Sequence, residues 1–378
     1  MTTDMERVAE AIRAFERGEV VVVTDDDDRE NEGDLIVAAV HCTPEIMGMF
    51  IRHTSGIVCA PMTGEEARRL NLAPMVAEND APHSTAFTVS VDYRHDTTTG
   101  ISAEERCSTV RALANPNAGA QDFVRPGHIF PLVAREGGVL IRSGHTEAAV
   151  DLCNLAGLPP VGVISELVND DGSVMRGPQI HEFAKEKNLQ VVTVDDLIAY
   201  RQRQERLVER VEEFDINTAH GAAKAVTYST EWDPMQQLAV IFGDIRDGRN
   251  VLVRLHVESV IDDAFGGSPA LQDHLAAIAE EGRGVVVYLR EGSVGVSGGS
   301  IRGASDESAR NQPAFGDDAE NHGAAQTRKE EWLEIGMGAQ ILKDLGVSSI
   351  RLIASKERHY VGLSGFGIEI ADTVLSDG

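Results

Sequence analysis

The sequence predicts an α/β protein made of two domains. Its 378 residues exceed the usual size of a single domain. Short apolar runs alternate along the chain with capped, amphipathic stretches, which is the alternation of strands and helices in α/β folds. A highly charged helical stretch at residues 197–212 separates two such halves, so we place the boundary near residue 205. The expected domains are therefore residues 1–205 and 206–378.

The first half begins with a helix that Asp4 caps and Gly18 ends, followed by a buried strand at residues 19–24. A second apolar run follows at residues 35–40. Further strands are expected at residues 87–91, 161–164 and 191–195, and helices at residues 45–53 and 146–156, the latter capped by Thr146. The segment RPGHIFP, residues 125–131, is bounded by proline and glycine and predicts a turn. A short apolar strand at residues 139–141 is expected to lead through RSGHTEA into the helix at residue 146.

The second half predicts a three-layer α/β domain. Strands are expected at residues 237–243, 251–256, 285–290 and 350–354, and helices near residues 271–281 and 332–345. Asp247 and Gly248 predict a hairpin turn between the first two of these strands. Residues 292–328 are rich in glycine, serine, alanine and charge, a composition that favours disorder over a functional loop.

Composition excludes several classes of protein. The net charge of −27 repels phosphate backbones and anionic membranes, so neither nucleic acid nor a membrane surface is an expected partner. The chain has four cysteines, none after residue 153 and none in a CxxC pair, which fits a reducing cytoplasm. The charged, amphipathic N-terminus does not resemble a signal peptide, and no apolar run is long enough to cross a bilayer. We therefore expect a cytoplasmic protein.

The acidic segment TDDDDRENEGD, residues 24–34, is the first candidate site. It holds seven carboxylates around one arginine. A charge run is usually a solvated loop. Here, however, the run directly follows a buried strand, where sites tend to be built. Crowded carboxylates favour a hard cation such as Mg²⁺ and raise one another's pKa, which suits acid–base chemistry.

Three further features could take part in the same chemistry. RSGHTEA, residues 142–148, places Arg142 beside a helix N-terminus, an arrangement that can bind phosphate, although an ordinary capped helix is an equally good reading. His128 would by itself be a packed histidine. Glu166 ends an apolar strand, which alone is a weak signal of function.

Together these segments resemble 3,4-dihydroxy-2-butanone 4-phosphate synthase. The matching stretches span residues 5–204 in order: VVVTDDDDRENEGDL, IRHTSGIVC, HSTAFTVSVD, TTTGISAEER, DFVRPGHIFPL, GGVLIRSGHTEAAVDL, LAGLPPVGVISE and ND-DGSVMR. The resemblance implies a mixed-sheet α+β domain that converts ribulose 5-phosphate into a four-carbon ketone phosphate and formate. It also implies a homodimer that uses magnesium. A His–carboxylate ligand pair would suit Mn²⁺ or Zn²⁺ at least as well as Mg²⁺.

The resemblance also implies roles for individual residues. The implied substrate-binding residues are Arg29, Glu30, Asp34, Arg142, Ser143, Gly144, His145, Thr146 and Glu166. The implied metal ligands are Glu30 and His145. His128 and Glu166 match positions essential for catalysis, and Glu32, Asp34 and Cys59 match further active-site positions.

Residues 206–378 resemble GTP cyclohydrolase II but depart from its zinc site. The matching stretches are LAVIFGDIRDGRNVLVRLHVES, AIAEEGRGVVVYLR, IGMGAQILKDLGV, IRLIAS and YVGLSGFGIEI. The positions of that family's three zinc-binding cysteines hold Ser259, Ala270 and Gln272. Its QEGRGIG turn is replaced by EGSVGVS at residues 291–297, and its catalytic Asp-x-Arg by Glu331-Trp332-Leu333.

These departures predict a second half without zinc and without GTP hydrolysis. Its role would be structural or regulatory: a second dimer interface, a site for another ligand, or a remnant that keeps the fold soluble. The alternative is a bifunctional enzyme with an altered cyclohydrolase site. A more distant alternative is a sugar-phosphate sensor without catalysis. The presence of Glu30, His128, His145 and Glu166 argues against a sensor, which would not need acid–base groups at all four positions.

Overall fold

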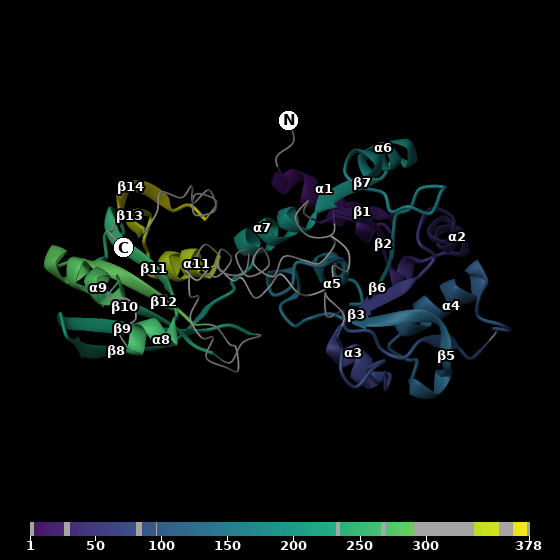
Figure 1. The fold of residues 1–378 in the computed structure, drawn as a ribbon, viewed down its shortest axis with the longest axis horizontal. Helices are drawn as coiled ribbons and strands as arrows, with labels where there is room; N and C mark the ends of the chain where they lie inside the picture. Colours follow the sequence, from purple (N-terminus) through teal and green to yellow (C-terminus); the bar gives the residue numbers. More distant parts are fainter. Residues whose placement is uncertain are drawn as a thin grey trace, which may run out of the picture. The chain divides into compact units, whose positions relative to one another are not determined.

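The computed structural model describes residues 4–25, 31–80, 85–95, 97–231, 235–265, 270–290, 336–354 and 366–375. The described chain forms two compact units, one up to Arg201 and the other from Gln202 onward (Figure 1). Each unit is built on a mixed β-sheet, so the predicted α/β class is confirmed. The predicted disorder at residues 292–328 lies outside the described residues.

The first unit contains a seven-stranded sheet in the order β4-β5-β3-β6-β2-β1-β7. In that order its strands are Val91–Tyr93, Phe123–Val133, Cys59–Met62, Gly162–Glu166, Gly33–Ala38, Val21–Thr24 and Gln190–Thr193. The helices α1 to α7 are Asp4–Glu16, Pro44–His53, Gly64–Arg69, Ala103–Leu113, His145–Leu155, Pro178–Lys187 and Val194–Gln204. Short 3₁₀ helices η1 to η3 lie at Ala39–His41, Ala120–Asp122 and Gly138–Leu140.

Helices cover both faces of this sheet, as strand β2 shows. Leu35 and Val37 of β2 belong to one buried cluster, while Ile36 and Ala38 belong to another. The first cluster includes side chains of α2, α4 and α6, and the second those of α1, α5 and α7. Because successive strand residues point to opposite faces, an apolar run without polar alternation is what a strand buried on both faces requires.

Most predicted elements of the first half are present, with three corrections. RPGHIFP is not a turn but part of β5. A Cβ atom at position 127 would overlap the backbone of Val91 in β4, so Gly127 permits the two strands to approach closely. Of the strand expected at residues 87–91, only Val91 belongs to a strand, β4, while Phe87 and Thr88 form isolated bridges.

The third correction concerns the start of α5. The residues before RSGHTEA form the 3₁₀ helix η3 rather than a strand. Helix α5 begins at His145 with Gly144 as its N-cap, and Thr146 is a buried residue of the first turn. The predicted cap at Thr146 is therefore wrong by two residues. His145 consequently belongs to the helix rather than preceding it.

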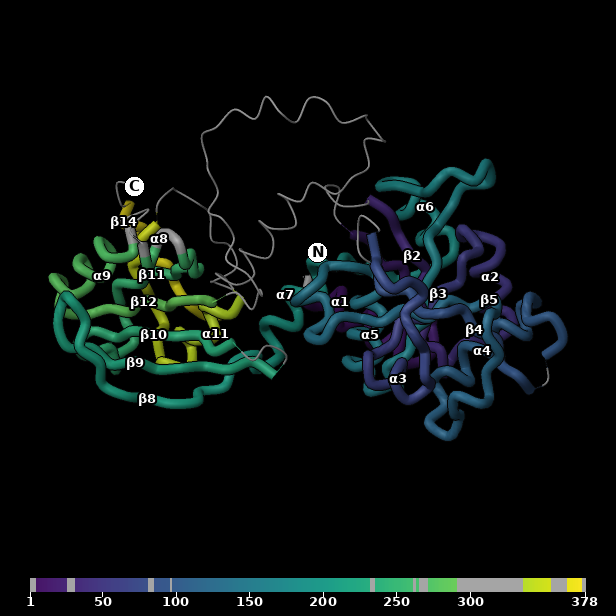
Figure 2. Tube along the Cα trace, turned by 60° about the horizontal axis from the view of Figure 1, so that its bottom comes forward, coloured from purple at the N-terminus to yellow at the C-terminus, as the bar shows by residue number. Residues whose placement is uncertain are grey.

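The second unit contains another seven-stranded sheet, ordered β14-β13-β11-β12-β10-β9-β8 (Figure 2). In that order its strands are Glu369–Leu375, Ser349–Ala354, Val251–Val257, Gly284–Leu289, Gln237–Phe242, Gly221–Ser229 and Glu209–Thr218. The described helices are α8 Val260–Phe265, α9 Ala270–Glu281 and α11 Gly338–Asp344. Ile278 of α9 packs against Leu252 and Val286 on one face. Gly338 of α11 lies against Leu255, which points to the other face, so three layers result.

Two predictions for the second half need correction. Asp247 and Gly248 form a turn but not a hairpin, because β12 lies between β10 and β11 in the sheet. The charged helix expected at residues 197–212 ends at Gln204, and its last residues belong to β8. That strand is at the edge of the sheet, where charged side chains are tolerated on a solvent-exposed surface. Among the described helices, none is both long and apolar enough to span a membrane.

The packing of α5 on the sheet gives a stability prediction. Leu152 of α5 is fully buried, whereas Leu155 one turn later is only partly buried. We expect Leu152→Ala to lower the free energy of unfolding by about 2–5 kcal/mol, because the cavity adds to the lost apolar burial. Leu155→Ala is the matched control and should cost clearly less. Thermal unfolding followed by calorimetry checks this, and equal losses in the two variants would contradict the assigned packing.

Candidate active site

Two carboxylates lie opposite each other on neighbouring strands. Asp34 of β2 pairs with Glu166 of β6 in the antiparallel register. Both side chains point to the same face as Ile36 and Ile164, the face on which α5 packs. Directly opposed residues in an antiparallel pair have Cβ atoms about 5 Å apart. Asp34 is buried and Glu166, at the end of its strand, is partly exposed, so the pair is accessible where β6 ends and β2 begins.

His145 adds a nitrogen donor to this pair. It is the first residue of α5 and is 7% exposed, with its Nδ1 atom 4.0 Å from Oδ1 of Asp34. An imidazole nitrogen beside a carboxylate oxygen is a donor set that divalent cations accept. Among the described residues, no three His, Cys, Asp or Glu side chains are placed to hold a metal ion. Arg29 and Glu30, the latter the other predicted ligand, lie outside the described residues.

Arg142 is held beside the N-terminus of α5 by residues that the sequence reasoning missed. Its Nη1 atom donates to Glu147 Oε2 at 2.6 Å, and its Nη2 atom donates to the Thr85 hydroxyl at 3.1 Å. Glu147 is itself fixed by the backbone N–H of Arg135. A Cβ atom at Gly144 would overlap the Arg142 guanidinium, so glycine leaves room for it. Ser143 lies between Arg142 and the N-cap Gly144, and Thr146 lies in the first turn of α5.

The Glu166 carboxylate is oriented by the loop that follows α2. The Ser55 hydroxyl donates to Glu166 Oε2 at 2.6 Å, and the Ser55 N–H donates to the Glu166 carbonyl at 2.8 Å. Thr54 donates in turn to the hydroxyl of Ser165 at 2.8 Å. Sequence reasoning did not single out Ser55, although it lies inside the matching stretch IRHTSGIVC. This network holds Glu166 at the end of its strand.

His128 is paired with a buried carboxylate. Its backbone N–H donates to Oδ1 of Asp92 in β4 at 2.7 Å, and its Nδ1 atom lies 2.7 Å from Oδ2 of the same carboxylate. A carboxylate acceptor at Nδ1 favours the tautomer that carries its proton there, which leaves Nε2 for other chemistry. Gly100 has a positive φ, and a Cβ atom there would overlap the Asp92 carboxylate. Asp92 was not predicted, although HSTAFTVSVD contains it.

The strand register places His128 in the same row as the carboxylate pair. Cys59 of β3 pairs with Phe130 of β5 on one side and with Ile164 of β6 on the other. Strands β5 and β6 run in opposite directions, so His128, two residues before Phe130, is level with Glu166, two residues after Ile164. Both side chains therefore point to the same face. They are two strand spacings apart, about 10 Å. They cannot contact each other directly, but a five-carbon substrate could reach both.

Cys59 lies beneath this row as a neutral thiol. It is 4% exposed. Burial, followed by the nearby carboxylates of Glu166 and Asp34, raises the pKa of the Cys59 thiol. A thiol with a raised pKa stays protonated at neutral pH and is a poor nucleophile. The structure therefore gives Cys59 the chemistry of a buried apolar or weakly donating group.

Glu32, near the end of the acidic segment, contacts both Asp25 and Arg176. Its N–H donates to Asp25 Oδ1 at 2.9 Å, and its Oε1 atom is 3.8 Å from Nη2 of Arg176. Arg176 also escaped sequence reasoning, although it ends the matching stretch ND-DGSVMR. Glu32 is thus placed by a charge partner from the loop after β6, rather than by the acidic segment alone.

In the second unit, hydrogen bonds surround the position where the cyclohydrolase pattern has its first cysteine. The Ser259 N–H donates to Asp263 Oδ2 at 2.9 Å, and the Tyr288 hydroxyl donates to the same oxygen at 2.7 Å. Nε2 of His256 is 2.9 Å from Asp263 Oδ1. Gln272, at the third cysteine position, bonds His220. Asp263 therefore connects α8 to β11 and β12. The other two departures from the cyclohydrolase pattern, at residues 291–297 and 331–333, lie outside the described residues.

The state of the Cys59 thiol is testable. Because its pKa is raised, we expect no alkylation by iodoacetamide in the folded protein between pH 7 and 9. Cys153 is a matched control: it is equally buried, and burial raises its pKa to about 12, yet it lies away from the carboxylate pair. Both should react in urea, with peptide mass spectrometry as the readout. Modification of folded Cys59 at its unfolded rate would contradict the assignment.

Comparisons with known proteins identify the families of the two halves. A family model for 3,4-dihydroxy-2-butanone 4-phosphate synthase matches residues 9–200, and one for GTP cyclohydrolase II matches residues 209–375. The riboflavin biosynthesis protein RibBA of Bacillus mycoides (strain KBAB4) is 44% identical over 373 residues, which are 97% of this chain and 92% of that protein. RibBA of Rhodococcus erythropolis (strain PR4 / NBRC 100887) is 44% identical over 383 residues, covering 98% of this chain and 89% of that protein.

Two solved structures are also similar. RibBX of A. baumannii, a two-domain 3,4-dihydroxy-2-butanone 4-phosphate synthase, is 34% identical with a TM-score of 0.81 and covers 98% of this chain and 100% of its own. A 3,4-dihydroxy-2-butanone 4-phosphate synthase in complex with two magnesium ions is 48% identical with a TM-score of 0.51, covering 52% of this chain and 97% of its own. The chain therefore belongs to the 3,4-dihydroxy-2-butanone 4-phosphate synthases, a family of lyases, and it continues into a domain of the GTP cyclohydrolase II family.

Proposed function

We propose that the first domain converts D-ribulose 5-phosphate into L-3,4-dihydroxy-2-butanone 4-phosphate and formate, as a step of riboflavin biosynthesis. The observation that carries this proposal is the row of His128, Glu166 and Asp34 on one sheet face, beside His145 at the end of α5. The reaction enolises the sugar, loses the C1 hydroxyl as water, rearranges the carbon skeleton and releases C4 as formate. The lost water is taken up again when formate leaves, so atoms balance.

The substrate phosphate would bind at the N-terminus of α5. Backbone N–H groups of the first helical turn and the Arg142 guanidinium offer donors there. Because Glu147 already neutralises part of the Arg142 charge, the helix end supplies an important share of the attraction. Ser143, Gly144 and Thr146 are proposed to line this turn, with Arg29 and Glu30 reaching the sugar from the acidic segment. A fixed phosphate sets the register of the carbon chain along the row of acid–base groups.

Several proton transfers at different carbons would explain why the site spans four neighbouring strands, from β5 to β2. Glu166, held by Ser55, and His128, held by Asp92, are proposed as the two catalytic acid–base groups at opposite ends of the substrate. Asp34 and Glu32 are proposed to act on the sugar hydroxyls between and beside them. Cys59 would pack beneath the substrate as a neutral thiol. In this arrangement, each proton donor or acceptor has its own oriented position.

The donor set fits a divalent cation, for which Mg²⁺ is our proposal and Mn²⁺ the alternative. Glu30 and His145 would hold it, and the Asp34 carboxylate lies 4.0 Å from the His145 ring. When bound, such a cation stabilises negative charge that develops on substrate oxygens. The related synthase with two magnesium ions supports the choice of metal. A homodimer and a cytoplasmic location remain predictions.

For the second domain we propose a structural or regulatory role without GTP cyclohydrolase activity. Ser259, Ala270 and Gln272 occupy the positions of the three zinc thiolates, and no cysteine follows residue 153. RibBX of A. baumannii, a two-domain synthase similar over the full chain, is compatible with this role. The alternative is a bifunctional enzyme with an altered site. It is favoured by the family match at residues 209–375 and by the full-length similarity to RibBA proteins.

Substitution of the acid–base groups tests the synthase proposal. We expect His128→Ala and Glu166→Ala each to lower formate release from ribulose 5-phosphate by at least about 10²–10⁴-fold, because each removes a proton-transfer group. Asp92→Asn keeps the imidazole but removes its charged acceptor, and should give an intermediate loss. Circular dichroism would confirm folding. Full activity of either alanine variant would refute the proposed roles.

Metal removal tests the zinc proposal for the second domain. Calorimetry of the full-length protein follows its thermal unfolding. We expect dialysis against EDTA followed by excess Mg²⁺ to leave the unfolding midpoint of the second domain unchanged, because no cysteine in this half can supply a thiolate zinc ligand. Asp263→Asn should lower the stability by about 1–3 kcal/mol, since it leaves donors without their charged acceptor. A midpoint that falls with EDTA and recovers with Zn²⁺ would contradict this account.

A further inference from the structure

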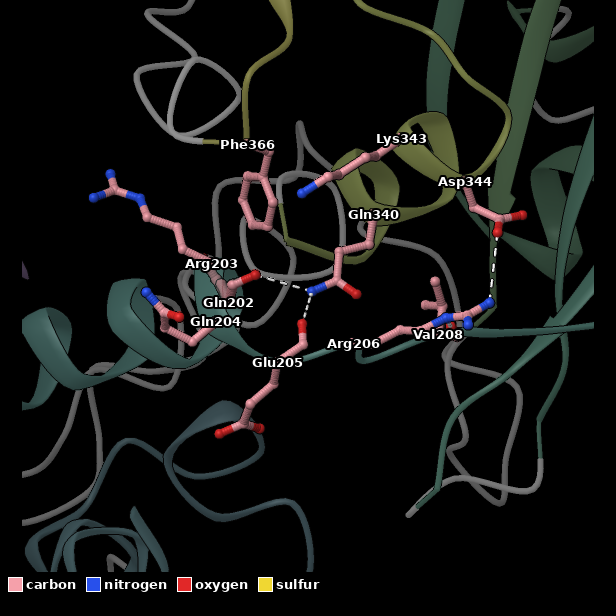
Figure 3. A pocket seen from close by; sticks show the side chains of 10 residues that line it. All are labelled: Gln202, Arg203, Gln204, Glu205, Arg206, Val208, Gln340, Lys343, Asp344 and Phe366. Carbon is pink, nitrogen blue, oxygen red and sulfur yellow. Dashed lines mark hydrogen bonds and ion pairs between the residues drawn. The ribbon is translucent and has the colours of Figure 1, made fainter. Parts of the chain in front are cut away.

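The second domain contains a cavity that is separate from the cyclohydrolase-type positions. It has a volume of about 300 Å³ and lies between the segment 202–208, helix α11 and Phe366 (Figure 3). The division between the units falls within α7, after Arg201, so all of these lining residues belong to the second unit. That volume is at the lower end of the range for small-molecule sites. None of Ser259, Ala270 and Gln272 lines it.

A buried glutamine holds the cavity open in a defined shape. The Gln340 amide is 8% exposed and makes three hydrogen bonds to the segment that forms the opposite wall. Its Nε2 atom donates to the carbonyls of Gln202 and Glu205 at 2.9 and 2.8 Å, and its Oε1 atom accepts from the Leu207 N–H at 2.6 Å. Because these bonds clamp the wall to α11, the cavity is preorganised rather than formed on binding.

The charge of the lining favours an anion. Arg203, Arg206 and Lys343 line the cavity together with Glu205 and Asp344. Asp344 is already engaged by Arg210 and the Tyr228 hydroxyl, both at 2.9 Å, and it pairs with Arg206 at 3.6 Å (Figure 3). Among the described residues no carboxylate pairs with Lys343, whose amine extends toward the cavity in Figure 3. Arg206 is thus committed to Asp344, and Lys343 offers the positive charge that an anionic ligand would meet at this place in a chain of net charge −27.

An aromatic ring supplies the second recognition element. Phe366 is 8% exposed, and its ring lies in the cavity wall beyond the Gln340 amide (Figure 3). Aromatic side chains favour planar rings packed against them in stacked or edge-to-face geometry. We propose that this cavity binds a small anion that carries an aromatic ring, such as an aryl phosphate. Lys343 binds the anionic group and Phe366 contacts the ring.

The side-chain amide of Gln340 offers a direct probe of this site. In full-length protein labelled with ¹⁵N-glutamine, its signal is assigned through the Gln340→Leu variant. We expect phenyl phosphate to shift this signal saturably. Inorganic phosphate and benzyl alcohol should bind at least about tenfold more weakly, because each lacks one of the two recognised groups.

Matched charge variants localise the binding. Lys343→Ala should weaken phenyl phosphate binding about tenfold or more, because it removes a charge-assisted contact. Lys185→Ala removes the same charge from an exposed position of the first domain and should change nothing. Three results would overturn the proposal: no shift of Gln340 up to about 10 mM ligand, equal binding of inorganic phosphate, or unchanged affinity in Lys343→Ala.

Discussion

Antiparallel pairing of β2 with β6 places Asp34 opposite Glu166, and the rest of the proposed catalytic face depends on that register. Side chains alternate between the faces of a sheet, so a slip of one residue would turn Asp34 away from α5 and bury a charge in the opposite core. Apolar residues hold the register, because Leu35 and Ile36 fill different cores on the two faces. Stability and chemistry therefore rest on the same pairing.

Each functional side chain in this face has a partner that fixes its direction. Ser55 holds Glu166, Asp92 holds His128, and Glu147 holds Arg142. Ser55 and Asp92 are remote in sequence from the groups they orient, whereas Glu147 lies in the first turn of α5, five residues after Arg142. Such support converts a set of flexible acids and bases into positions that a sugar phosphate can meet together. It also explains why the glycines at 100, 127 and 144 are needed, since each lets backbone or side chain approach closely.

Local sequence pattern predicted what depends on local physics. Capped amphipathic stretches such as α1 and buried runs such as β1 could be placed, as could Glu166 at the end of its strand. The turn predicted at RPGHIFP was wrong because Gly127 serves close strand packing, which depends on a distant neighbour. The roles of Ser55 and Asp92 could not be predicted for the same reason, because they arise only when distant segments meet. Glu147 lies inside RSGHTEA, but its pairing with Arg142 depends on the local geometry of the helix start. The resemblance to known families supplied the roles that spacing alone left open.

We propose that chemistry resides in the first domain and that the second domain lacks cyclohydrolase activity. The most direct test assays the full-length protein in parallel, with ribulose 5-phosphate and Mg²⁺ in one reaction and GTP with Zn²⁺ and Mg²⁺ in the other. We predict formate from the sugar and no pyrimidine product from GTP. Turnover of GTP would mean that a working cyclohydrolase site exists without thiolate ligands, and absence of formate from the sugar would contradict the assignment of the first domain.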